Sequence, residues 1–165
     1  MGSRREAILS PLQKAFAPDV FTLPREEPQL IGGRCATCTA VTFPAAPSCA
    51  KCGSVAVERH LLPSRGTLWT FTTQGFLPKE PYAGGETQAT FVPFGVGIVQ
   101  LGDVVRVEAR LTENDPAKLA FGMEMELVFM PFRTDDAGTE ILTYAFAPAG
   151  PAHKLADAGI EKKES

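Results

Sequence analysis

The chain has 165 residues, of which 44% are hydrophobic and 21% charged, a composition typical of a folded domain and not of a disordered one. Its apolar runs are much shorter than the roughly 20 residues that cross a bilayer. Arg4 and Arg5 are not followed by the apolar segment of a secretion signal. We therefore expect a cytoplasmic protein with no membrane partner.

The net charge of −3 is unevenly distributed along the chain. Residues 66–147 contain 5 Lys or Arg and 11 Asp or Glu, a balance of −6, whereas residues 30–65 contain 4 basic residues and 1 acidic one, a balance of +3. Nucleic-acid binding requires a basic groove, because neutralising phosphates dominates the affinity. The acidic second half therefore argues against a nucleic-acid partner.

Residues 1–29 are predicted to form an N-terminal arm. The run Ser10-Pro11-Leu12-Gln13 has an N-cap residue, a proline at the first helical position and Gln at the third. It predicts a helix of about two turns that ends before Pro18, with Ala15 and Phe16 on its apolar side. So short a helix is marginal in water and must pack on its own domain or on a partner protein.

Residues 30–65 contain all four cysteines, in two C-x2-C pairs with ten residues between them: Cys35, Cys38, Cys49 and Cys52. Each pair points two thiolates at one centre, and two pairs complete a tetrahedron, the arrangement of a closed structural zinc site. Two disulfides, four unrelated thiols, or iron in place of zinc are the alternatives. The spacing favours a structural zinc ion bound by the four cysteines.

Short strands are predicted around the two cysteine pairs, at Leu30-Ile31, Thr39–Phe43 and Val55–Val57. Gly53 directly follows the second pair, where the chain must turn tightly around the metal. Thr39 holds the equivalent position after the first pair and is less suited to such a turn. The pattern predicts a small zinc ribbon.

From Gly66 onward the hydrophobic period is two, which is typical of β-strands. Trp69 and Phe71 are predicted to share one face of a strand at Thr67–Thr73, and Leu101–Val104 reads as a hairpin turn. Five strands, several of them rich in glycine, favour a small closed barrel, with an open sandwich as the alternative. The predicted strands are Thr67–Thr73, Phe94–Ile98, Val105–Ala109, Met123–Phe129 and Ile141–Phe146.

Residues 148–165 are rich in Pro, Ala, Gly, Lys and Glu and are predicted to be a flexible tail. The fold class predicted from these segments is therefore mainly β: a short N-terminal helix (residues 1–29), the ribbon (30–65), the barrel (66–147) and the tail.

Independent catalysis is not expected of this chain. If the four cysteines bind zinc, no free thiol remains, and a closed four-thiolate site has no open coordination position for a substrate. The imidazoles are His60, between ribbon and barrel, and His153 in the tail, so the sequence offers no nucleophile with a base and an orienting group. Whether the chain takes part in catalysis as a subunit is left open.

The order of arm, paired-cysteine ribbon and barrel resembles a bacterial and archaeal family first described as domain of unknown function thirty-five. That family joins a rubredoxin-like zinc ribbon to an OB-fold. The resemblance covers residues 10–147, and the two alanines after Phe43-Pro44 depart from it because the family usually has a second proline and a basic residue there. Besides the cysteines, the resemblance rests on Phe43-Pro44, Gly66-Thr67, Thr70, Pro93, the Val99–Val104 hairpin and Phe121-Gly122-Met123.

The resemblance implies a five-stranded OB-fold barrel and a role as accessory subunit. Members of the family associate with thiolase-superfamily enzymes as small non-catalytic subunits in hetero-oligomers. The reactions of those partners include β-ketoacyl-CoA thiolysis, Claisen condensation and retro-aldol cleavage of CoA-linked side chains. Single-stranded nucleic-acid binding, common for zinc ribbons and OB-folds taken separately, and a stand-alone metalloprotein of the rubredoxin electron-carrier type remain the alternative functions.

The long loop Gln74–Val92 is the candidate for contact with CoA or with the partner. Loops of this length in a small domain tend to be functional or disordered. Its aromatic residues and one lysine would suit a pantetheine channel or a protein interface, whereas packing against the ribbon is the structural alternative. The candidate contact residues are Phe76, Lys79, Tyr82 and Phe91.

Overall fold

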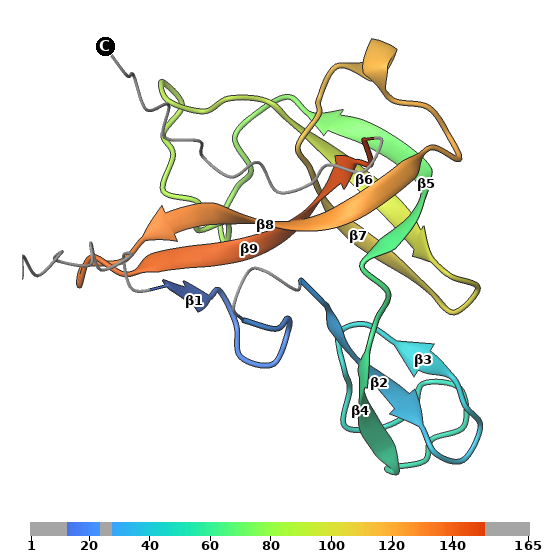
Figure 1. The fold of residues 1–165 in the computed structure, drawn as a ribbon. Helices are drawn as coiled ribbons and strands as arrows, with labels where there is room; N and C mark the ends of the chain where they lie inside the picture. The colour runs from blue at the N-terminus through green and yellow to red at the C-terminus, as the bar shows by residue number, and fades with distance from the viewer. Residues whose placement is uncertain (1–12, 24–27, 151–165) are drawn as a thin grey trace, which may run out of the picture.

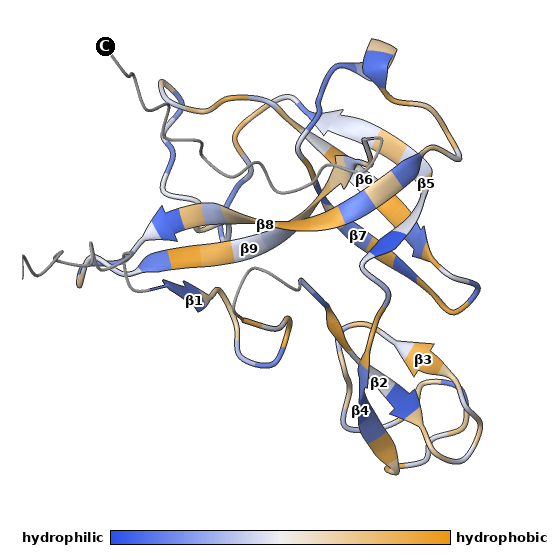
Figure 2. Ribbon diagram, in the orientation of Figure 1, coloured by the Kyte–Doolittle hydropathy of each residue, from blue (hydrophilic) through white to orange (hydrophobic). Residues whose placement is uncertain are grey.

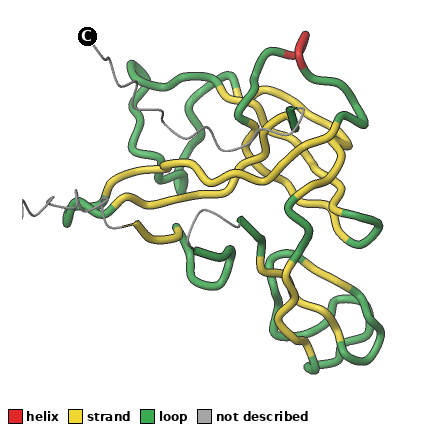
Figure 3. Tube along the Cα trace, viewed as in Figure 1, coloured by secondary structure: helices red, strands yellow, loops and turns green. Residues whose placement is uncertain are grey.

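The computed structural model describes residues 13–23 and 28–150, which form two β-sheets (Figure 1). In these residues, the helical structure is one 3₁₀ turn, Pro116–Lys118, and no helix is long and apolar enough to cross a membrane (Figure 3). The mainly β fold class is confirmed. The strands are β1 (Gln13–Ala15), β2 (Ile31–Cys35), β3 (Val41–Thr42), β4 (Val57–Leu61), β5 (Arg65–Gln74), β6 (Phe94–Leu101), β7 (Val105–Leu111), β8 (Glu124–Thr134) and β9 (Glu140–Pro148).

Five of the strands close into the predicted barrel. β5 pairs with β6 and β6 with β7, β7 runs parallel to β9, and β9 pairs with β8, which returns to β5. The turn at Gly102, whose φ is 55°, joins β6 to β7 as the sequence predicts. Along β6 every second residue is buried, so one side of the strand faces the barrel core. Hydrophilic and hydrophobic bands along β8 can be followed in Figure 2.

Trp69 and Phe71 do not share a face of β5, contrary to the prediction. Leu68 pairs with Val99 and Thr70 with Ile98, so Trp69 is an additional residue in a β-bulge. The bulge changes the alternation of the side chains. Trp69 is therefore 50% exposed, whereas Phe71 packs against the hydrophobic core.

The predicted N-terminal helix is wrong for the residues that the structure describes. Gln13–Ala15 is strand β1, which pairs in parallel with Glu140–Leu142 of β9. The remainder of the predicted helix, up to Leu12, lies outside the described residues. The edge of β9 offers the backbone groups of this short segment hydrogen-bond partners, and this tertiary pairing overrides the local helix signals.

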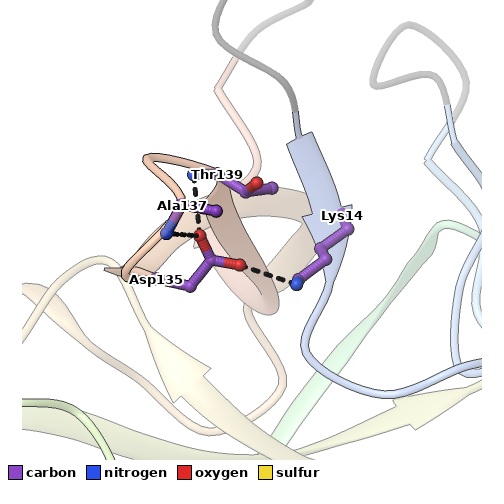
Figure 4. A network of polar contacts seen from close by, with 4 residues as sticks. All are labelled: Lys14, Asp135, Ala137 and Thr139. Carbon is purple, nitrogen blue, oxygen red and sulfur yellow. Dashed lines mark hydrogen bonds and ion pairs between the residues drawn. The ribbon is translucent and has the colours of Figure 1, made fainter.

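Side chains fasten β1 to the turn between β8 and β9 (Figure 4). The Lys14 ammonium lies 2.7 Å from a carboxylate oxygen of Asp135. The other Asp135 oxygen accepts hydrogen bonds from the backbone N–H groups of Ala137 (3.0 Å) and Thr139 (2.9 Å). The Lys14 ammonium and these N–H groups lower the pKa of Asp135 to about 2. The carboxylate thus organises the turn and holds β1 against it.

The arm, the ribbon and the barrel share one hydrophobic core. Phe21 of the arm is 5% exposed, and its ring centroid lies 4.3 Å from that of Phe129 in β8. The Phe43 ring of the ribbon meets Tyr144 of β9 edge-on, with 5.5 Å between the centroids. Leu62, just after β4, is fully buried in the same cluster. These contacts set the position of the ribbon against the barrel.

Candidate metal centre

The two cysteine pairs sit in two turns of the same geometry. In the first, the Thr39 N–H donates to the Cys35 carbonyl (2.9 Å), and in the second the Gly53 N–H donates to the Cys49 carbonyl (2.8 Å). Both residues that donate have left-handed backbones, with φ of 63° at Thr39 and 75° at Gly53. The turn therefore requires a conformation that glycine adopts freely and that strains a β-branched threonine.

The four sulfur atoms form a cage of the size that zinc requires. The Sγ atoms of Cys35 and Cys52 are 3.6 Å apart, those of Cys38 and Cys49 are 3.5 Å apart, and all four lie within 4.8 Å of one another. Tetrahedral zinc with Zn–S bonds of about 2.3 Å places its sulfurs about 3.8 Å apart. All four cysteines are free thiols, so the disulfide alternative does not apply.

The backbone around the sulfurs favours thiolates. The N–H groups of Cys38 and Thr37 point at the Cys35 sulfur and lower the pKa of that thiol to about 6. The N–H groups of Cys52 and Lys51 lower the pKa of Cys49 in the same way. The backbone thus favours the thiolate form at two of the four sulfurs.

Cys52 shows why the cage needs a cation. The Ser54 N–H lowers the pKa of Cys52, but its thiol also faces the sulfurs of Cys38, Cys35 and Cys49, and the pKa rises to about 12. A fourth thiolate is unfavourable next to three others unless a positive charge compensates them. A divalent metal supplies that charge, because metal binding displaces the thiol protons.

The donor set fits structural zinc held by Cys35, Cys38, Cys49 and Cys52. Cys35 and Cys49 are buried, Cys38 is half-buried and Cys52 is exposed. Four protein sulfurs fill a tetrahedral zinc, so no position remains for a substrate, and the metal's contribution is to fix the two turns. His60 lies in β4 opposite Gly32, while His153 is outside the described residues.

The predicted contact residues of the long loop do not converge on one site. Phe76 is 72% exposed, and the Phe91 ring packs against Phe94 with 5.9 Å between the centroids. Tyr82 packs edge-on against Phe132 of β8, so this part of the loop lies over the barrel. For Lys79, the structure gives one contact, a hydrogen bond from the Tyr82 N–H to its carbonyl oxygen (3.2 Å).

Tyr82 lines two hollows on the barrel. One, of about 200 Å³, is lined mainly by aromatic rings and by Arg110; the other, of about 480 Å³, contains Glu86 and Arg133. The Tyr82 hydroxyl donates to Glu86 (3.2 Å), and burial together with this carboxylate raises the pKa of Tyr82. The second carboxylate oxygen of Glu86 is buried without a hydrogen-bond partner in the described residues.

Sequence reasoning missed Glu86 and Arg110 as neighbours of Tyr82. Arg110 is far from the loop in sequence, and it reaches Tyr82 only because β7 lies beside β9 in the closed barrel. Glu86 is one of many acidic residues, and nothing in its spacing singles it out.

Two family models match this chain. One describes the rubredoxin-like zinc ribbon domain of ChsH2 and matches residues 24–58; the other describes the C-terminal OB-fold domain of ChsH2 and matches residues 60–130. The cysteine cage and the closed barrel thus define a protein of the zinc-ribbon and OB-fold class.

Two curated relatives then identify the family: the chain belongs to the DUF35 family. A DUF35 domain-containing scaffold protein of Pyrococcus furiosus is 33% identical over 125 residues, which is 75% of this chain and 86% of the relative. A protein of the same description from Methanocaldococcus jannaschii is 31% identical over 121 residues, 72% of this chain and 81% of the relative. The predicted family resemblance is confirmed.

The fold is also similar to that of a solved structure. A chain of the Ltp2-ChsH2(DUF35) aldolase superposes with a TM-score of 0.54 at 24% sequence identity. The match covers 73% of this chain and 84% of the solved one. Ribbon and barrel therefore occur in a known arrangement.

Proposed function

We propose that this chain is a non-catalytic accessory subunit of a thiolase-type acyl-CoA enzyme complex, in which the partner enzyme carries out the thiolysis, condensation or retro-aldol cleavage. The observation that carries the proposal is the cysteine cage: it uses every cysteine of the chain, so none is left as an acyl-transfer nucleophile. Support also comes from the curated relatives, which are described as scaffold proteins.

The enzyme class proposed for the partner rests on two less direct observations. The solved chain with the same fold belongs to an aldolase described together with ChsH2(DUF35), so a protein of this fold occurs beside a carbon–carbon bond enzyme. Exposed aromatic side chains on the barrel, among them Phe121 (73% exposed) and Trp69 (50% exposed), are the kind of residues that protein interfaces bury. Both points favour a hetero-oligomer.

The proposal includes a contact between the loop and the CoA chain at Tyr82. The hollow of about 480 Å³ beside Tyr82 is large enough for a section of a flexible ligand. The unpaired oxygen of Glu86 would accept a hydrogen bond from an amide N–H, a group that pantetheine carries twice, whereas Arg133 in the same hollow would face an anionic group.

Co-expression with the thiolase-superfamily enzyme encoded beside this chain tests the proposal. We expect the two proteins to co-purify, and the thiolase activity to fall when this chain is omitted. In the complex, Glu86→Gln should raise KM for the acyl-CoA with little change in kcat, and the exposed neighbour variant Thr87→Ala should leave KM unchanged. Failure to co-purify, with thiolase activity indifferent to this chain, would refute the accessory role.

A further inference from the structure

The outer face of the barrel at β5, β6 and β7 carries a row of alternating charge. Arg106, Glu108 and Arg110 are successive outward residues of β7, and the residues between them, Val107 and Ala109, are buried. Arg106 and Glu108 are exposed. The order of charges along the strand is therefore positive, negative, positive.

Each arginine guanidinium lies over an aromatic ring of another barrel strand. The Arg106 guanidinium carbon is 4.0 Å from the ring centroid of Trp69 in β5, and that of Arg110 is 4.0 Å from the centroid of Phe94 in β6. The Arg106 Nε also donates to Gln100 (2.8 Å). Stacking holds a guanidinium in place, and the N–H groups that are not used toward Gln100 or Tyr82 remain for a carboxylate.

Neither arginine has a carboxylate partner in the part of the chain that the structure describes; the arginine ion pair found there is Arg65–Glu126. Arg106 and Arg110 are four positions apart in an extended strand. At about 3.3 Å per residue, their Cα atoms are about 13 Å apart. The two arginines thus leave β7 at a backbone spacing that matches every fourth residue of another extended chain.

A hollow lies on the same face, around the register pair Ile98–Glu108, which falls between the register pairs of Arg106 and Arg110. Its volume is about 230 Å³, room for one large apolar side chain. Val96 and Ile98 of β6, both half-buried, form its floor together with residues of β5, and Glu108 forms the wall on the β7 side. The full lining is Thr70, Phe71, Thr72, Val96, Gly97, Ile98 and Glu108.

We infer that this face binds an extended segment of the partner enzyme. The face is called the β7 face below, and it consists of the hollow together with Arg106, Trp69, Arg110 and Phe94. The segment carries a carboxylate, an apolar side chain and a second carboxylate at alternate positions. The two carboxylates pair with the stacked arginines, and the apolar side chain fills the hollow. The inference rests on the proposed accessory function and names the surface that performs it.

A single-stranded nucleic acid fits this face less well. Its phosphates follow one another without interruption, and one of them would lie near the Glu108 carboxylate between the arginines. The Trp69 and Phe94 rings, on which bases would stack, are already covered by guanidinium groups. Residues 66–147 also carry a balance of −6. The charge pattern selects a segment with carboxylates at its two ends and none in the middle.

Charge reversal in the complex provides the first test. The double variant Arg106→Glu/Arg110→Glu should weaken binding of the co-purifying enzyme at least tenfold at low salt, and the difference should shrink as salt is added. Arg59→Glu, an exposed reversal in the ribbon, is the matched control and should leave affinity within twofold of the unaltered protein. Unchanged melting temperatures would show that the variants fold.

If the unaltered protein binds its enzyme and the double variant binds equally well, the β7 face is not the interface, and the accessory function stands. If the unaltered protein binds no enzyme, the accessory function fails, and a second experiment decides on the face separately. That experiment titrates the blocked peptide Glu-Thr-Leu-Thr-Glu into the protein and follows the Trp69 indole N–H by NMR.

We expect saturable shifts of the Trp69 indole signal and of β6 amides at millimolar peptide. These shifts should be lost with the matched peptide Gln-Thr-Leu-Thr-Gln and in the double variant. No shift with the acidic peptide would overturn the inference. So would tight binding of a thymidine decanucleotide that the double variant abolishes, because the face would then be a nucleic-acid site.

Discussion

The ribbon and the barrel of this protein are held together by different means. The ribbon has three short strands, of which β3 is two residues long, and two of its buried side chains are the metal ligands Cys35 and Cys49. The barrel has five strands of seven to eleven residues that close on one another around fully buried residues such as Leu68, Val99 and Phe146. A module of about thirty residues cannot bury enough apolar surface to be stable alone, whereas the barrel can.

The comparison shows that the two parts of the protein are stabilised in different ways. The metal fixes the ribbon, the closed strands fix the barrel, and the shared cluster around Phe21 and Leu62 fixes one against the other. Substitutions in the ribbon, in the barrel and in the shared cluster should therefore change different measurable properties of the protein.

Loss of a metal ligand should have the largest effect. Cys49→Ala removes a buried thiolate from the cage, and structural zinc binding contributes on the order of 10 kcal/mol to the folding of such modules. We expect zinc bound per chain to fall well below one, the ribbon amide signals in NMR spectra to collapse, the barrel signals to persist and complex assembly to be lost. The neighbouring exposed variant Ser48→Ala should bind zinc normally. A Cys49→Ala protein that assembled with full activity would contradict a structural role for the metal.

Phe21→Ala should come next, because it empties a buried site at the junction. A fully buried Phe→Ala replacement costs about 3–5 kcal/mol, and Phe21 is 5% exposed against the Phe129 ring. Chemical denaturation measures the loss, and the zinc content should stay at one per chain. Phe76→Ala, the same replacement at an exposed position, should change stability by less than about 0.5 kcal/mol. Equal losses in the two variants would mean that Phe21 does not join the arm to the barrel.

Exchanging the residues of the two turns should give smaller effects of opposite sign. Thr39→Gly relieves a left-handed β-branched residue and should stabilise the protein by about 1 kcal/mol, whereas Gly53→Thr should destabilise it by about 1–2 kcal/mol. The midpoint of zinc release to a chelator on heating is a suitable measurement. If both variants moved this midpoint in the same direction, backbone strain would not be the cause.

The smallest effect is expected at Asp135, whose contribution depends on pH. The pKa of Asp135 is about 2 in the folded protein, against an ordinary value of 3.8, because Lys14 and the turn N–H groups stabilise the carboxylate. Its contribution to stability is therefore fully present above about pH 4 and is lost as the pH falls toward 2. The difference in unfolding free energy between the unaltered protein and Asp135→Asn should be constant from pH 6 to about 4.5 and shrink below it. A difference that stayed constant down to pH 2 would contradict this account of Asp135.

The strands of the barrel could be predicted because their signals are local, whereas β4 of the ribbon lies at Val57–Leu61 and overlaps the predicted strand Val55–Val57 at one residue. Alternation of apolar residues marks a half-buried strand wherever it pairs, and two C-x2-C pairs supply a complete ligand set within eighteen residues. The poor fit of Thr39 to its turn could also be predicted, because both turns must follow the same path around the sulfurs.

The wrong predictions concern segments whose structure depends on residues far away in the sequence. The signals for a helix at Ser10–Gln13 are real, but the β9 edge, more than one hundred residues away, pairs with Gln13–Ala15 instead. The Trp69 bulge cannot be read from β5, because it is defined by the register with β6. The contact residues of the loop remain predictions, and of these Tyr82 is placed beside Glu86 and Arg110.

The sequence by itself determined the two cysteine pairs, the number of barrel strands and the family, since each depends on residue type and short spacing. Only the tertiary structure decided that Gln13–Ala15 of the arm is a strand, that Trp69 faces outward under Arg106 and that Glu108, between Arg106 and Arg110, lines a hollow on the outer face. The physical reason is that closing the barrel fixes which strands are neighbours. A side chain's partners across a sheet follow from that register and from nothing local to the side chain.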